Sequence, residues 1–131
     1  MKRWVVSWSP AAVWAAFLFL LSSRPTLPVN MELGFDKVAH FGAYLILGAL
    51  LAFGAERLRL SPKLTVLLGF SYGAIDEIHQ SFVPGRFASV GDWVADALGT
   101  VAGVLLFLFV SHRRAAKATG RLSTNAESVS T

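Results

Sequence analysis

Long runs without a charged side chain decide what this sequence can fold into. The first, from Trp4 to Ser23, covers 20 residues. A helix of that length crosses a hydrocarbon core about 30 Å thick, because each residue adds about 1.5 Å. A second run extends from Val38 to Ala55 and contains no charged side chain apart from His40. We therefore expect a helical membrane protein.

The composition supports this class. Hydrophobic residues make up 54% of the 131 residues, which is too apolar for a soluble domain of this size. The absence of cysteine excludes disulfides, thiolate metal sites and cysteine nucleophiles. A net charge of +4 would suggest nucleic acid as the partner of a soluble protein, but lysine and arginine also collect in cytoplasmic loops. The sequence therefore predicts no nucleic-acid partner and no cofactor.

The predicted fold is all-α, a polytopic bundle of four transmembrane helices. Local signals mark where the last two helices begin. Ser61-Pro62 is suited to be the N-cap and first residue of the third helix. Ser89, followed three residues later by Asp92, predicts a capping box for a fourth helix over residues 90–111. Pro84-Gly85 predicts a tight turn between them.

The chain divides into three predicted parts. Residues 1–35 form the first transmembrane helix and an external loop, residues 36–111 form a unit of three transmembrane helices, and residues 112–131 form a basic cytoplasmic tail that we expect to be disordered. A cleaved signal peptide is the alternative for the first helix. It is disfavoured because Leu21-Ser22-Ser23-Arg24 is a poor small-x-small cleavage site.

The distribution of basic residues predicts the orientation. With four crossings and both termini in the cytoplasm, nine of the 12 lysine and arginine residues lie on the cytoplasmic side. These residues are Lys2, Arg3, Arg57, Arg59, Lys63, Arg113, Arg114, Lys117 and Arg121. The excess follows the positive-inside rule. We therefore expect both termini inside and the loop between the third and fourth helices outside.

The third hydrophobic run is too short to cross a membrane by itself. Leu64 to Ile75 covers 12 residues, or about 18 Å of helix. If the helix spans, the polar side chains that follow lie beneath the outer membrane surface; they are Asp76, Glu77, His79 and Gln80. Charged groups in that position suggest a functional site. The alternative is a half-helix that re-enters the membrane under cover of protein or water.

Helical spacing brings further polar groups to this end of the bundle. Asp36, His40 and Tyr44 fall on one stripe of the second helix, at intervals of four residues. Asp92 and Asp96 share a stripe of the fourth helix, which Gly99 and Gly103 continue, while Gly69 and Gly73 lie on the third helix. Because small residues let helices approach closely, we expect the third and fourth helices to touch along these glycines. That contact would bring Asp76 or Glu77 near Asp96.

Each polar residue also has a structural explanation. Asp36 and Asp92 could cap helices, and His40 could form an interhelical hydrogen bond. Arg86 could pair with carboxylates and lock the bundle. Yet five acids face only Arg86 and Lys37, an excess of negative charge that favours a ligand cation, a protonated carboxyl group or a wet pocket.

Three motifs follow one another along the chain: Asp36-Lys37-Val-Ala-His40 with Tyr44 and Gly48, then Asp76-Glu77-Ile-His-Gln80-Ser-Phe82-Val-Pro84-Gly85-Arg86, then Asp92 with Gly99 and Gly103. In this order they resemble the VanZ-like family of small bacterial membrane proteins. The resemblance covers most of residues 36–110. It implies a role in the cell envelope and a place in the bacterial cytoplasmic membrane, since the family's namesake is associated with reduced susceptibility to teicoplanin. The chain departs from the family at Asp96, where asparagine is usual.

The first functional hypothesis is a binding protein with a polar pocket in the outer leaflet. Its ligand would be a membrane lipid head group, a cell-wall precursor or a glycopeptide, with Arg86 holding a phosphate or carboxylate group. The predicted ligand-binding residues are Asp36, Lys37, His40, Tyr44, Asp76, Glu77, Gln80, Arg86, Asp92 and Asp96.

The second hypothesis is an intramembrane enzyme that acts on a lipid-linked substrate by acid/base catalysis. Its candidate catalytic residues are Asp76, Glu77, Asp92, Asp96 and His40, with His79 as an alternative proton shuttle. Two histidines and several carboxylates could also hold a divalent cation. No HExxH or comparable ligand spacing is present, so the sequence predicts no metal.

Overall fold

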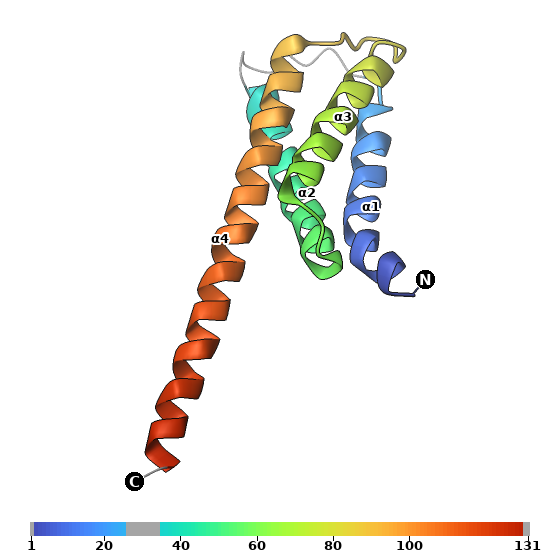
Figure 1. The fold of residues 1–131 in the computed structure, drawn as a ribbon. Helices are drawn as coiled ribbons and strands as arrows, with labels where there is room; N and C mark the ends of the chain where they lie inside the picture. Colours follow the sequence, from blue (N-terminus) through green and yellow to red (C-terminus); the bar gives the residue numbers. More distant parts are fainter. Residues whose placement is uncertain (1, 26–34, 130–131) are drawn as a thin grey trace.

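The protein is a bundle of four helices, seen here in a computed structural model that describes residues 2–25 and 35–129, with side chains as far as Arg121. The helices are α1 (Lys2–Ser22), α2 (Phe35–Leu58), α3 (Pro62–Gln80) and α4 (Val90–Val129) (Figure 1). The described residues contain no strand. The predicted all-α fold is therefore confirmed. Residues 26–34, which hold most of the predicted external loop, lie outside the described part.

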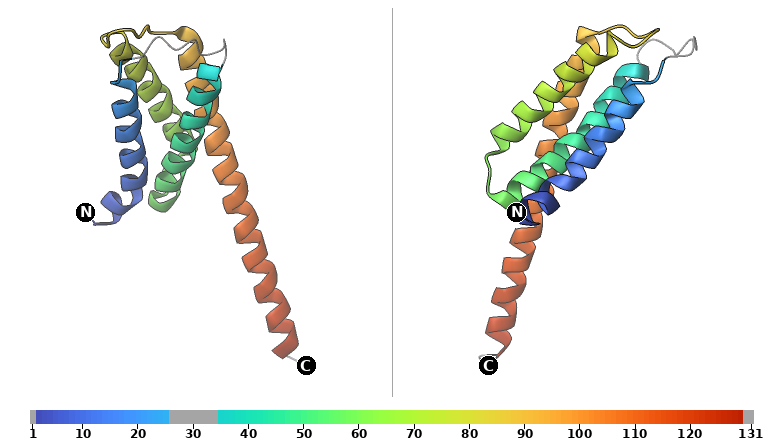
Figure 2. Two further views of the ribbon diagram at one scale, coloured as in Figure 1. Left: turned by 180° about the vertical axis from the view of Figure 1, so that it is seen from behind. Right: turned by 90° about the vertical axis from the view of Figure 1, so that its right-hand side faces the viewer.

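The helices run alternately up and down. In Figures 1 and 2, α1 and α3 run toward the loop of residues 81–89, and α2 and α4 run back from it. The two ends of the chain consequently lie on the same side of the bundle. This arrangement agrees with the even number of crossings that the basic residues predict.

The outer surface of the bundle is apolar. Val13, Val38, Ile75 and Leu105, one on each helix, are between 60% and 70% exposed. By length and hydropathy, α1, α2 and residues 90–121 of α4 are each able to cross a membrane. Among the described helices α3 falls short of this standard because its last turns are polar. It still lies beside the others, and its 19 residues extend about 28 Å.

Two of the local signals in the sequence form as predicted. Ser61 is the N-cap of α3, where its side chain accepts a hydrogen bond from the backbone N–H of Lys63. The turn at Pro84-Gly85 is closed by a hydrogen bond from Arg86 N–H to Val83 O, at 3.1 Å. Gly85 has a φ of 79°, which glycine adopts without steric cost.

The glycines of α3 and α4 face different partners. Gly69 and Gly73 face α4, as predicted, since a side chain at Gly69 would meet Thr100. Gly99 and Gly103 face α2 instead, where a β-carbon would meet backbone atoms. The prediction that these two glycines contact α3 was wrong. Thr100, one residue and about 100° further around the helix than Gly99, takes the position toward α3.

Helix α2 is central to the bundle. Its contact with α4 is the most extensive between any two helices, and α1 packs on its other side. Trp14 of α1 donates its indole N–H to Ala43 O of α2 at 2.9 Å, and Tyr72 of α3 donates its hydroxyl to Ala15 O of α1 at 2.6 Å. Two hydrogen bonds from side chains to backbone carbonyls thus join α1 to α2 and α3 within the bundle.

The last helix is longer than the sequence predicts. We expect disorder from residue 112 onward, whereas α4 continues to Val129 and projects beyond the bundle (Figure 1). Ala115, Ala116 and Lys117 in this extension are strong helix formers. They also prolong a helix already started within the bundle, so each residue gains a hydrogen bond without the cost of nucleation.

Candidate functional site

Three helix ends meet at the loop of residues 81–89. The end of α3 lies there beside the first turns of α2 and α4 (Figures 1 and 2). They bring together a set that we call the acidic centre: Asp76, Glu77, Asp96, His40 and Tyr44. The three carboxylates are buried, with 5%, 6% and 1% of their residues' surfaces exposed. The predicted approach of the α3 acids to Asp96 is therefore confirmed.

His40 and Asp96 form the link between α2 and α4. His40 Nδ1 lies 2.9 Å from Asp96 Oδ1, a hydrogen bond between side chains that are 16% and 1% exposed. Asp36 and Asp92 lie in the first turns of α2 and α4, and His40 and Asp96 follow them by four residues, or about one helical turn. The contact is thus deeper in the bundle than the capping positions.

Glu77 caps α4 from the neighbouring helix. Its Oε2 accepts a hydrogen bond of 2.6 Å from the backbone N–H of Ser89, and Ser89 Oγ accepts one of 3.3 Å from the N–H of Asp92. Ser89 therefore acts as the predicted N-cap. The prediction that Asp92 completes the capping box was wrong, because Glu77 occupies the Ser89 N–H.

Asp76 begins a chain of hydrogen bonds that reaches α1. Its Oδ2 accepts from Gln80 Nε2 at 3.1 Å, and Gln80 Oε1 accepts from an Arg86 N–H at 2.8 Å. Arg86 also donates to the carbonyl oxygens of Leu21 and Arg24, each at 3.4 Å. The loop arginine is thus joined to the acidic centre through Gln80, and among the described residues it forms no direct hydrogen bond with a carboxylate.

Lys37 lies at the rim of the site. Its ammonium group is 2.9 Å from Asp92 Oδ1 and 3.3 Å from Asp36 Oδ2. Lys37 is 48% exposed and Asp92 is 13% exposed, so this network is in contact with the surface. The predicted site residues therefore separate into a buried centre and a rim. The rim consists of Asp36, Lys37, Gln80, Arg86 and Asp92, of which Gln80 alone is buried.

Several buried oxygen atoms in this region have no hydrogen-bond partner within the described residues. They are Asp76 Oδ1, Glu77 Oε1, Asp96 Oδ2, the Tyr44 hydroxyl and Thr100 Oγ1. Buried polar atoms are normally paired, because an unpaired one loses its hydration without compensation. Their concentration between α2, α3 and α4 marks a place where a proton, an ion or a polar ligand group would gain interactions.

Thr100 is a buried polar residue of the site that the sequence-based prediction does not include. It is fully buried one turn below Asp96, against Gly69. The spacing of four residues from Asp96 could have identified it, since such residues share a helix face. The prediction was based on Gly99 and Gly103 instead, which lie on the face of α4 that contacts α2.

His79 does not belong to the acidic centre. Its Nε2 lies 2.9 Å from Ser23 Oγ, and its ring stacks on Phe19 with the ring centres 4.3 Å apart. Both contacts belong to the α1 side of the bundle. A role for His79 as a proton shuttle between the carboxylates does not fit this position.

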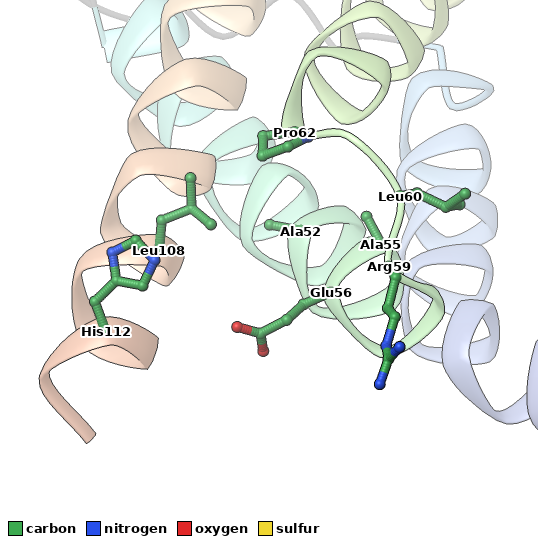
Figure 3. A pocket seen from close by; sticks show the side chains of 8 residues that line it. All are labelled: Ala52, Ala55, Glu56, Arg59, Leu60, Pro62, Leu108 and His112. Carbon is green, nitrogen blue, oxygen red and sulfur yellow. The ribbon is translucent and has the colours of Figure 1, made fainter. Parts of the chain in front are cut away.

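A separate cavity of about 300 Å³ lies at the other end of the bundle. It is formed where α2 ends and α3 begins, against the middle of α4 (Figure 3). The lining residues are Ala52, Ala55, Glu56, Arg59, Leu60, Pro62, Leu108 and His112. This cavity shares no residue with the acidic centre and lies on the side of the two chain ends.

The charges of the acidic centre do not balance. Among the described residues, Glu77 and Asp96 lie beside one group that can become cationic, His40, and Asp76 adds a third buried carboxylate. The cations of the rim are already bonded to other residues. Burying charges costs several kcal/mol per ion, in order of magnitude, unless each is paired. The centre is therefore suited to accept protons or a cation, and the rim is suited to contact an anion.

Comparison with known proteins identifies the family. A family model described as VanZ/LLP1 matches residues 2–111, which is most of the chain and includes every residue of the centre and the rim. No curated protein and no solved structure matches the chain. The expected resemblance is confirmed by a match that extends from α1 through the apolar part of α4. The chain belongs to the VanZ/LLP1 family.

Proposed function

We propose that the chain is a multi-pass protein of the bacterial cytoplasmic membrane that binds the polar head group of a lipid or lipid-linked cell-wall precursor in the outer leaflet. The observation that carries this proposal is a charged centre, buried at one end of a bundle whose outer surface is apolar. Family membership supports a role in the envelope and a contribution to reduced glycopeptide susceptibility. The excess of basic residues on the other side supports cytoplasmic termini.

The rim offers cations to a phosphate or carboxylate group. Arg86 uses part of its guanidinium on Gln80 and on two backbone carbonyls. Five N–H groups are available on this side chain, so some remain for an anionic ligand. Lys37, which is 48% exposed, is a second cation at the same end. Amide or ammonium groups of the ligand would then point toward the carboxylates.

The loop of residues 81–89 supports a membrane-surface location. Phe82 and Phe87 flank the turn and are 80% and 86% exposed. Exposed aromatic side chains are favourable at the membrane–water interface, where aromatic residues are enriched. Insertion of these rings would hold Arg86 at the level of the lipid head groups.

Arg86→Gln is expected to reduce retention of the bound lipid by about 10-fold to 100-fold, because a hydrogen bond to a charged group contributes about 1.5–3 kcal/mol. Native mass spectrometry of the purified full chain would measure lipid retention. Teicoplanin susceptibility of cells expressing the same variant is the second readout. Arg114→Gln is the matched control, since Arg114 is exposed on the opposite side of the bundle. Equal retention in the two variants at equal folded yield would contradict the proposal.

The His40–Asp96 pair favours a second candidate function, acid/base catalysis on a lipid-linked substrate. His40 Nδ1 and Asp96 Oδ1 are 2.9 Å apart, and a Glu77 oxygen lies within 4.8 Å of ligand atoms of both residues. A histidine oriented by a carboxylate beside a second carboxylate can move a proton to or from a reacting group.

An enzyme should change the lipids of the cell. Cells that express the chain are expected to gain or lose a defined lipid species relative to cells that express Asp96→Asn, as measured by mass spectrometry of lipid extracts. Asp96→Asn keeps the shape of the side chain but replaces the carboxylate by an uncharged amide. Identical extracts, with both proteins present in equal amounts in the membrane, would exclude this candidate in favour of binding.

A further inference from the structure

Three helices each contribute one metal-ligating side chain to the acidic centre. They are His40 of α2, Glu77 of α3 and Asp96 of α4, and one ligand atom from each lies within 4.8 Å of the other two. His40 Nδ1 and Asp96 Oδ1 are the closest, at 2.9 Å. The cluster combines a nitrogen and two carboxylate groups at a single point, although the residues are far apart in the sequence.

The unused atoms of this cluster point to a cation. Within the described residues, Glu77 Oε1 and Asp96 Oδ2 have no hydrogen-bond donor. The same is true of the hydroxyl of Tyr44, a residue that is only 2% exposed and whose charged neighbours are the carboxylates of Asp96, Asp76 and Glu77. An oxygen-rich interior with free lone pairs is the environment that a divalent cation requires.

Within the part of the chain that the structure describes, no lysine or arginine side chain is bonded to these three carboxylates. Lys37 is bonded to Asp36 and Asp92 at the rim, and Arg86 is bonded to Gln80. Asp76 receives a hydrogen bond from the neutral amide of Gln80, which supplies no charge. His40, if protonated, would offset one of three buried carboxylates. A divalent ion bound to the neutral imidazole of His40 would offset two of these three charges.

The ligand set indicates the class of metal. One imidazole with two carboxylates is a borderline donor set, which suits Zn²⁺ or Mn²⁺ better than a thiolate-seeking ion. Ligand atoms about 2.1 Å from a tetrahedral metal lie about 3.4 Å from one another. The ligand atoms of His40, Glu77 and Asp96 all lie within 4.8 Å of one another, so they are close enough for side-chain rotation to bring them to this spacing. Three protein ligands leave a position open for water or another oxygen ligand.

We propose that His40, Glu77 and Asp96 bind a divalent metal ion of the borderline class, Zn²⁺ or Mn²⁺. The metal takes the place of the proton shared by His40 and Asp96 and joins α2, α3 and α4 at one point. Tyr44 and Asp76 lie beside it as groups that can bond to its water ligands. This inference does not require that the protein bind a lipid head group, because the site is complete within the chain.

Titration of the purified full chain in detergent with ZnCl₂ and, separately, MnCl₂ tests the site. Calorimetry is expected to show one ion bound per chain, and metal is expected to raise the thermal unfolding midpoint. Glu77→Gln and Asp96→Asn should each weaken binding by at least about 100-fold, since loss of even a second-shell partner costs about 10-fold to 100-fold. Both variants keep the size of the side chain.

Glu56→Gln is the matched control for these variants. Glu56 is an acid of α2 bonded to Ser111 at the other end of the bundle, so its replacement should leave metal affinity unchanged. The proposal is overturned if the folded wild-type chain binds neither ion, or if Glu77→Gln and Asp96→Asn bind as tightly as Glu56→Gln. Size-exclusion profiles of the metal-free proteins show whether each variant is folded before titration.

Discussion

Gly103→Val is expected to separate α2 from α4 and to leave little folded protein. A β-carbon at position 103 would collide with backbone atoms of Leu45 and Ala49, which cannot rotate away as a side chain can. This contact belongs to the most extensive helix pair in the bundle. Overpacking commonly costs about 1–3 kcal/mol, and a backbone collision belongs at or above the top of that range. Unfolding by SDS, followed by circular dichroism in mixed micelles, measures the loss.

Gly42→Val is the matched control for this prediction. Gly42 is also in a membrane helix of the bundle, but a β-carbon there meets no atom within 4 Å. Its replacement should change the free energy of unfolding by less than about 0.5 kcal/mol, as is usual away from packed sites. If the two valine variants unfold at the same SDS fraction, α2 and α4 are not packed through Gly103.

The helices themselves could be predicted because their signals are local. The run from Trp4 to Ser23 is long enough to span a membrane whatever surrounds it, and α1 covers nearly the same residues. Ser61 acts through a bond to a residue two positions away and Gly85 through its own backbone conformation, so their roles follow from the immediate sequence. The end of α4 could not be predicted in this way, since helix propensity competes with disorder in a polar segment.

Which residues contact each other across two helices depends on the rotation of each helix about its axis. Local sequence signals do not determine this rotation. Gly99 and Thr100 differ by one residue and about 100°, and they face different helices. Glu77 and His79 differ by two residues and about 200°, so one enters the acidic centre and the other faces α1. The acidic residues of the site can therefore be predicted from the sequence, but the residues that they contact cannot.

A metal site illustrates the same limit. No compact ligand motif is present in the sequence, which therefore predicts no metal. His40, Glu77 and Asp96 come from three helices, so their separation along the chain carries no information about their distance in space. The short apolar run of α3 was the useful signal, since it required Glu77 to lie at the depth of the other two residues.

Among the side chains of the acidic centre, we expect replacement of His40, the partner of the buried Asp96 carboxylate, to lower the free energy of unfolding most. His40→Leu removes the hydrogen bond to Asp96 Oδ1 and leaves a carboxylate that is 1% exposed, with no other hydrogen-bond donor among the described residues. Loss of one member of a buried ionic pair costs about 3–5 kcal/mol. We expect that loss in the SDS unfolding free energy of the metal-free protein.

Asp96→Asn separates the charge from the shape of the side chain. The carbonyl oxygen of asparagine can still accept a hydrogen bond from His40, so the single variant should lose about 1 kcal/mol or less. Combined with His40→Leu it should recover most of the stability lost by His40→Leu alone, because no buried charge then remains without a partner. A double variant as unstable as the sum of the two single variants would show that His40 stabilises the bundle by packing, and that Asp96 is not charged in the folded protein.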